Sequence, residues 1–127
     1  MKNIIKTDIA PKAIGPYSQG VISNGFIFLS GQIAITANGE VLTDRSVGEQ
    51  TELILENIGA LLRISGCSYE NVVKTTIFLT DMNDFTTVNE IYAKYFKEDP
   101  PARSTVAVAA LPRGAKIEIE CIAVQVL

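Results

Sequence analysis

The stretch that decides the fold is YSQGVISNGFIFLSGQIAI, residues 17–35. It predicts two strands, Tyr17–Ser23 and Phe26–Ile35, joined at Asn24-Gly25, because Asn-Gly is the strongest short hairpin signal. The run Phe26-Ile27-Phe28-Leu29 is apolar on both faces, which predicts a central strand. The chain is therefore expected to begin with a β-hairpin whose second strand lies inside the sheet.

Helical and strand patterns alternate along the rest of the chain. A helix is predicted over Ser46–Ser65, because apolar residues recur at helical intervals and Ser46 occupies a capping position. A second helix is predicted from Asn83 or Asp84 to about Lys97, just before a proline pair that stops it. The remaining strands are expected at Val72–Thr80, Arg103–Leu111 and Lys116–Val126.

The element order ββαβαββ indicates an α+β fold with a mixed β-sheet, in a single domain spanning residues 1–127. Both helices are expected on one face of the sheet, because each has an apolar stripe to bury. The other face would stay uncovered, although pairs such as Val106 with Val108 and Ile122 with Val124 offer it apolar groups. Since an uncovered apolar face usually marks an assembly surface, we expect a homo-oligomer.

Composition argues against several classes of function. The chain has 11 basic and 14 acidic residues, a net charge of −3, and its basic residues are scattered, which argues against nucleic-acid binding. It has no histidine and two distant cysteines, so neither histidine catalysis nor a metal site is expected. No segment approaches the ~20 apolar residues that cross a membrane, and residues 1–10 lack a signal-peptide pattern, so we expect a cytoplasmic protein.

Two late strands offer side chains suited to a reaction. Arg103 and Thr105 share one face of their strand, and Glu118 and Glu120 share one face of theirs. If these strands pair through the turn at Arg113-Gly114, Arg103 and Glu118 come near each other on one sheet face. Arginine binds a carboxylate through two parallel hydrogen bonds, and glutamate accepts a proton from water beside an electrophilic carbon. A surface or interface ion pair is the competing interpretation.

Other polar positions have both a structural and a functional interpretation. Gly31 either lets a ligand approach the backbone or marks a bulge or tight packing, and Ser30 beside it has no histidine to activate it. Tyr17 either lines a pocket or packs against its neighbours. Asn89 either caps a neighbouring element or touches a ligand, and Thr105 is expected to act mainly through its main chain.

Five segments carry a resemblance that covers the whole chain. They are Ala13–Gly20, Ser30–Gln32, Pro101–Ser104, Leu111–Arg113 and Lys116–Glu120. In this order and spacing they resemble the RidA (YjgF) family of reactive-intermediate deaminases. The resemblance implies a chorismate-mutase-like fold and a homotrimer with a ligand cleft at each subunit interface. It also implies a cofactor-independent 2-iminobutanoate/2-iminopropanoate deaminase, which hydrolyses imines and enamines such as 2-aminoacrylate to 2-keto acids and ammonia.

The resemblance further implies roles for single residues. Arg103 matches the arginine that binds the substrate carboxylate, and Glu118 matches the glutamate that positions or activates the hydrolytic water. Thr105 stands where many members have cysteine, so the choice of imine differs here if the thiol shapes it. The positions expected to contact substrate besides Arg103 are Tyr17, Ser30, Gly31, Asn89 and Thr105.

Besides a chorismate mutase, whose chemistry needs several cationic groups where only Arg103 is placed, two other functions stay open at this stage. The first is a non-catalytic binder of small carboxylates that regulates a partner protein, which turnover of an imine would separate from a deaminase. The second is a ribonuclease or translation inhibitor, an activity reported for some relatives. The net negative charge and the absence of histidine count against that second function.

Overall fold

The structure is a computed structural model that describes residues 1–125. Within them, a 6-stranded sheet has the order β1-β2-β3-β6-β4-β5. Its strands are β1 (Lys2–Ile5), β2 (Gly20–Ser23), β3 (Phe26–Gln32), β4 (Val72–Leu79), β5 (Ala102–Ala107) and β6 (Ile117–Val124). β4 and β5 run parallel and the other neighbours run antiparallel, so the sheet is mixed, as predicted. The β2–β3 hairpin and the internal position of β3 are also confirmed.

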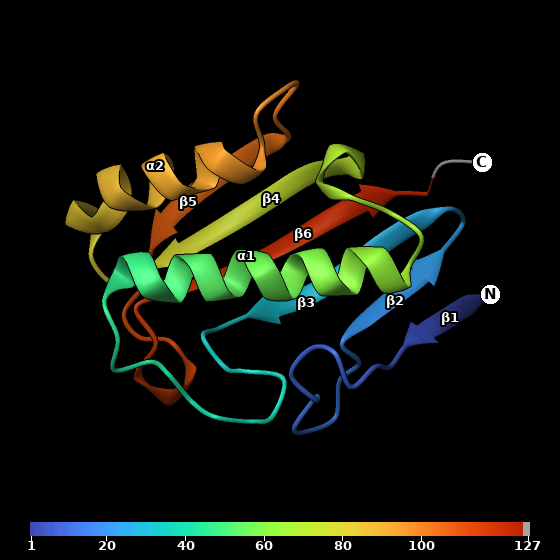
Figure 1. Ribbon diagram of the computed structural model, residues 1–127, viewed down its shortest axis with the longest axis horizontal. Coiled ribbons are helices and arrows are strands. Elements are labelled where there is room, and N and C mark those ends of the chain that lie inside the picture. The colour runs from blue at the N-terminus through green and yellow to red at the C-terminus, as the bar shows by residue number, and fades with distance from the viewer. Residues whose placement is uncertain (126–127) are drawn as a thin grey trace.

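The helices α1 (Val47–Ile64) and α2 (Phe85–Tyr95) lie on the same face of the sheet, as predicted (Figure 1). Ser46 caps α1, because its hydroxyl accepts the Glu49 N–H at 3.1 Å. The helices bury apolar side chains against alternate residues of each strand. In β6, for example, Ile117 and Ile119 are fully buried, whereas Glu118 between them is half-buried on the opposite face. Short 3₁₀ turns, η1 (Tyr69–Asn71), η2 (Met82–Asp84) and η3 (Pro112–Gly114), complete the secondary structure of residues 1–125.

The face of the sheet away from the helices, which we call the open face, carries large apolar side chains. Phe26 and Phe28 of β3 are each 43% exposed, and Val106 of β5 and Val124 of β6 are 43% and 36% exposed. Phe26, Phe28 and Val124 alternate in sequence with buried residues, and Val106 is opposite Phe78, which alternates with buried residues of β4. All four therefore belong to the side that no helix covers. The apolar open face expected from the sequence is therefore present. Across residues 1–125, no helix is both long and apolar enough to span a bilayer.

Strand boundaries differ from the sequence prediction in several places. β1, which pairs with β2 at the sheet edge, was not predicted, because only Ile5 among its four residues is buried and no alternation shows. β3 stops at Gln32 rather than Ile35, after a bulge that follows Leu29. β2 starts only at Gly20. β5 ends at Ala107 rather than Leu111, and β6 covers Ile117–Val124, while the predicted end of that strand at Val126 lies outside the described residues.

The largest correction concerns the last two strands. β5 and β6 were predicted to pair through the turn at Arg113-Gly114, and this prediction is wrong because β4 lies between them. β4, α2 and β5 form a βαβ unit, whose crossover helix returns the chain parallel to β4 on its outer side. β6 then fits between β3 and β4, antiparallel to both. β4 therefore separates β5, which carries Arg103, from β6, which carries Glu118.

Candidate active site

Arg103 lies on the helix-covered side of the sheet, at its β5 edge. It is opposite Thr75 in the parallel β4–β5 register, and Thr75 is buried toward the helices. The guanidinium Nη1 donates to Asn89 Oδ1 at 2.7 Å. Its central carbon lies 4.9 Å from the ring centroid of Tyr92 and 5.5 Å from that of Phe85. α2 therefore orients this arginine, and Asn89, a candidate ligand contact in the sequence, binds Arg103 directly.

Glu118 lies on the open face, on the internal strand β6. It is opposite Phe78 of β4 and beside Gly31, at the bulge in β3. A Cβ atom on Gly31 would overlap the Glu118 carboxylate and would lie 2.8 Å from its Cδ. Gly31 therefore lies at a bulge and packs tightly against Glu118, as its structural interpretation predicted, and the approach of a ligand there stays a prediction. Burial raises the pKa of the Glu118 carboxyl, and the negative charge of Glu120 raises it further.

Arg103 and Glu118 were predicted on one sheet face, and within one chain this is wrong. Their β4 partners, Thr75 and Phe78, are three residues apart and so point to opposite faces. An open depression of about 560 Å³ beside Arg103 is lined by residues of α2, by Phe96 and by the segment 100–103, and Glu118 is not among them. The two side chains form no common pocket in the single chain.

The other candidate residues divide between these two places. Ser30 lies with Gly31 on β3, where its hydroxyl donates to the Ser18 carbonyl at 2.6 Å, so Ser30 ties the preceding loop to the sheet. Tyr17 in that loop is 53% exposed, and its hydroxyl accepts the Ile14 N–H at 3.3 Å. Thr105 lies on the Arg103 face, and its buried hydroxyl has no hydrogen-bond partner within residues 1–125.

We therefore describe two half-sites. The β3–β6 half-site holds Ser30, Gly31 and Glu118, and the β5–α2 half-site holds Arg103, Asn89 and Thr105. Tyr17 lies in the loop that Ser30 anchors, so it belongs beside the first half-site and away from Arg103. No group of three or more Cys, Asp or Glu residues suited to a metal ion occurs in the described part of the chain.

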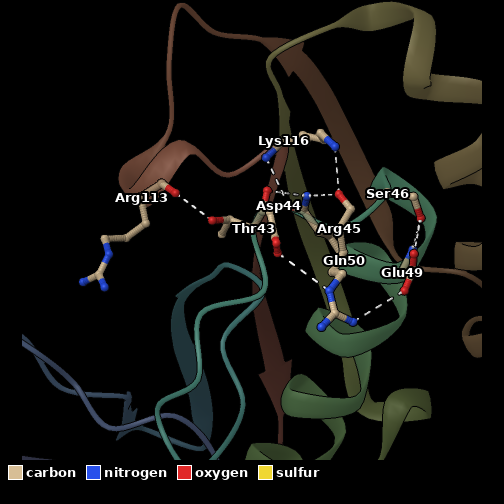
Figure 2. A network of polar contacts seen from close by, with 8 residues as sticks. All are labelled: Thr43, Asp44, Arg45, Ser46, Glu49, Gln50, Arg113 and Lys116. Atoms are coloured by element: carbon tan, nitrogen blue, oxygen red, sulfur yellow. Dashed lines mark hydrogen bonds and ion pairs between the residues drawn. The ribbon is translucent and has the colours of Figure 1, made fainter.

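The start of β6 is fixed by a polar network around Gln50 (Figure 2). The side chain of Gln50 is 1% exposed, donates to the carbonyls of Thr43 and Arg45 at 3.0 and 2.7 Å, and accepts the Lys116 N–H at 3.1 Å. The Thr43 hydroxyl donates to the Arg113 carbonyl at 2.7 Å. This network attaches the segment that precedes Glu118 to the first turn of α1, so the β3–β6 half-site is built on rigid elements.

Comparison with known proteins places the chain in a family. The sequence profile described as endoribonuclease L-PSP matches residues 7–125. The chain is 54% identical over 96% of its length to the chloroplastic Reactive Intermediate Deaminase A of Arabidopsis thaliana, of which it spans 65%. It is 49% identical over 98% of its length to the Homo sapiens 2-iminobutanoate/2-iminopropanoate deaminase, of which it spans 91%. The chain belongs to the endoribonuclease L-PSP family, which is the RidA (YjgF) family.

The fold agrees with that of a solved structure of similar sequence. The Escherichia coli TdcF protein, crystallised with bound serine, superposes with a TM-score of 0.91 at 45% identity, covering 98% of this chain and 99% of that chain. The α+β architecture expected from the resemblance is therefore confirmed for this RidA-family chain.

Sequence reasoning missed the residues that surround Arg103. Phe85 and Tyr92 read from the sequence as part of the apolar stripe of α2, and Thr75 reads as an ordinary strand residue. A signal was available, because Phe85, Asn89 and Tyr92 follow the i, i+4, i+7 spacing of one helix face. What the sequence lacked was the parallel β4–β5 register, which places Arg103 beneath that face.

Proposed function

We propose that this protein hydrolyses small 2-imino and 2-enamine acids to 2-keto acids and ammonia. The observation that carries the proposal is 49% identity over 98% of the chain to a protein named 2-iminobutanoate/2-iminopropanoate deaminase. The Arabidopsis relative, named Reactive Intermediate Deaminase A, supports the same activity. A cytoplasmic location belongs to this proposal, although that relative is named chloroplastic.

The two candidate residues divide the chemistry. Arg103 binds the substrate carboxylate through its planar guanidinium. Glu118 takes a proton from a water molecule as the water oxygen attacks the imine carbon and the C=N π bond opens, and Glu118 returns that proton to the nitrogen. Glu118 then takes the hydroxyl proton of the resulting carbinolamine as the C=O bond forms, and passes it to the nitrogen, which leaves as ammonia. The pKa of Glu118 is raised toward neutral pH, and a group whose pKa is nearer the working pH can both accept and return a proton. Tyr17, Ser30, Gly31, Asn89 and Thr105 remain the proposed contacts of the substrate or of these two residues.

The site is completed by a second copy of the chain, in a homotrimer. Arg103 and Glu118 face opposite sides of one sheet, so one substrate can meet both only if they come from different copies. The exposed Phe26, Phe28 and Val124 give the open face an apolar surface suited to a neighbouring sheet. These features support the trimer with inter-subunit clefts that the family resemblance implies.

An imine-hydrolysis assay tests the proposal. An amino-acid oxidase generates imines from a series of amino acids, and semicarbazide traps the imine that survives. The protein should lower semicarbazone formation, and the Arg103→Ala variant should not, while its melting temperature stays near that of the wild type. If neither protein lowers semicarbazone formation for any imine, the deaminase proposal is wrong and a carboxylate-binding regulator becomes the better interpretation.

The name of the family, endoribonuclease L-PSP, favours one competing activity, cleavage of RNA. The net charge of −3 and the absence of histidine in the sequence support deamination over that activity. Incubating the protein with labelled single-stranded RNA at low salt separates the two. Cleavage that survives in Arg103→Ala and Glu118→Gln would point to an RNA site elsewhere on the chain.

A further inference from the structure

We propose that Tyr92 is a positioning residue for Arg103: its ring, held in place by Thr75, orients the guanidinium that receives the substrate carboxylate. This inference rests on the proposed function, in which Arg103 binds that carboxylate. Tyr92 itself touches no reacting atom in this proposal. It acts only through the arginine.

The first observation is the contact of Arg103 with one face of α2. Phe85, Asn89 and Tyr92 are spaced by four and three residues, so they lie in a row along the helix. The guanidinium lies across this row, 5.5 Å from the Phe85 ring, 2.7 Å from the Asn89 oxygen and 4.9 Å from the Tyr92 ring. Both ring distances are within the range of cation–π attraction, and Tyr92 is the nearer of the two.

The second observation is that Tyr92 is itself immobilised from the sheet side. Its hydroxyl shares a hydrogen bond of 2.6 Å with the hydroxyl of Thr75, and these residues are 5% and 1% exposed. Thr75 is also the β4 residue directly opposite Arg103. Burial raises the pKa of Tyr92, so the hydroxyl keeps its proton and this bond persists at neutral pH. Thr75, Tyr92 and Arg103 therefore form a continuous stack from the sheet to the guanidinium.

The consequence is a preorganised cation on an edge strand. Arg103 is exposed, and without the stack its long side chain would sample many rotamers. Within residues 1–125, its one hydrogen bond uses Nη1, so the edge formed by Nε and Nη2 is available for a bidentate carboxylate. Fixing the guanidinium before substrate arrives lowers the entropy lost on binding, which should show in KM rather than in kcat.

The test compares matched hydroxyl deletions. Tyr92→Phe and Thr75→Val each remove one side of the Thr75–Tyr92 bond and keep the local volume. Tyr69→Phe is the control, because the Tyr69 hydroxyl also donates a hydrogen bond, partly buried, to the Leu55 carbonyl at 2.7 Å, while its ring packs on Tyr95 and Phe96. Phe85→Leu provides a variant that removes the second ring and leaves the stack intact. Melting temperatures check that all four fold.

Two readouts decide the inference. In imine hydrolysis, Tyr92→Phe and Thr75→Val should raise KM about three- to tenfold with kcat changed less than about twofold, and Tyr69→Phe should leave both unchanged. By NMR on the ligand-free protein, the Arg103 Nε–H, assigned by its loss in Arg103→Lys, should be restrained in wild type and Tyr69→Phe and mobile in the two stack variants. Phe85→Leu should give a smaller change of the same kind.

Failure of this inference is distinguishable from failure of the proposed function. If the wild type hydrolyses imines but Arg103 stays equally restrained and KM is unchanged in Tyr92→Phe and Thr75→Val, the positioning role is wrong and the function stands. If the wild type hydrolyses no imine, the proposed function is wrong, and the NMR comparison still decides whether Tyr92 orients Arg103.

Discussion

The two half-sites hold their principal side chains by opposite means. Arg103, on the edge strand β5, is exposed and is oriented by other side chains, namely Asn89 and the rings of Phe85 and Tyr92. Glu118, on the internal strand β6, is half-buried and occupies room that exists because Gly31 has no side chain. One position is therefore set by contacts from α2, and the other by the register and the bulge of the sheet.

This difference predicts different tolerances to substitution. The arginine can be loosened gradually, by removing one contact at a time, because several independent groups hold it. The position of the glutamate depends on two neighbouring strands that are part of the core. A substitution in these strands is therefore expected either to displace the carboxylate fully or to have no effect, with no gradual loosening. In the proposed assembly, an edge-strand cation from one copy would meet the opposite sheet face of another copy.

The largest expected effect comes from removing the proposed proton acceptor, Glu118. Glu118→Gln keeps the shape of the side chain, so product 2-keto acid should still bind while kcat falls about 100- to 10,000-fold. In the wild type, kcat/KM should fall at acid pH with a midpoint above the ordinary glutamate value, because the pKa of Glu118 is raised. Stopped-flow assays across pH measure both. If Glu118→Gln kept more than about half of the wild-type turnover, Glu118 would not be the proton acceptor.

A charge placed on the open face should break the proposed assembly that would join the half-sites. Phe28→Glu would bury a carboxylate among apolar groups at the proposed interface, so we expect dissociation to single chains and about a 100-fold loss of turnover. Ile64→Glu is the matched control, because Ile64 is 50% exposed at the end of α1, away from the open face. Light scattering measures the mass of each variant. An unchanged mass for Phe28→Glu would mean that the interface lies elsewhere.

A milder substitution tests whether substrate binding weakens gradually as Arg103 loses its contacts. Arg103→Lys keeps the charge but loses the planar fork, the Asn89 geometry and most of the stacking on Tyr92, so KM should rise about tenfold while kcat changes less. Steady-state kinetics on one imine, with Lys97→Arg as a surface control, separate the two constants. A fall in kcat alone would show that Arg103 acts in the transition state and not in ground-state binding.

Much of this architecture could be predicted from the sequence, for a physical reason. The hairpin at Asn24-Gly25, the capped helix after Ser46 and the alternation in β6 are local patterns, written within a few residues. The two half-sites were not predictable in the same way, because they depend on which strands become neighbours. The sequence pattern predicted that the strands of Arg103 and Glu118 form a hairpin. In the structure, the crossover through α2 puts β5 on the outer side of β4, so β4 separates these two strands.

The importance of Gly31 for Glu118 leads to a subtler prediction. Gly31→Ala should push the carboxylate out of its place, lowering kcat about tenfold with little effect on KM, because the arginine half-site is untouched. Gly48→Ala is the control, because its added Cβ would meet the Ile91 side chain at 3.3 Å, far from Glu118 in the fold. Steady-state kinetics of the two variants give the answer. Equal activity in both would show that Glu118 tolerates displacement and that its position is not set by Gly31.

The smallest effect expected is on stability, and its sign is informative. A carboxyl whose pKa is raised in the folded state stabilises the fold fully below its unfolded pKa and loses that contribution as pH rises through the folded pKa. At pH 7 the charged Glu118 therefore opposes folding, and Glu118→Gln should melt on the order of 1–3 °C higher, with the difference vanishing near pH 4. Scanning calorimetry at several pH values measures this. Within residues 1–125, Glu118 has no ion-pair partner, so a lower melting temperature for Glu118→Gln at pH 7 would contradict the prediction.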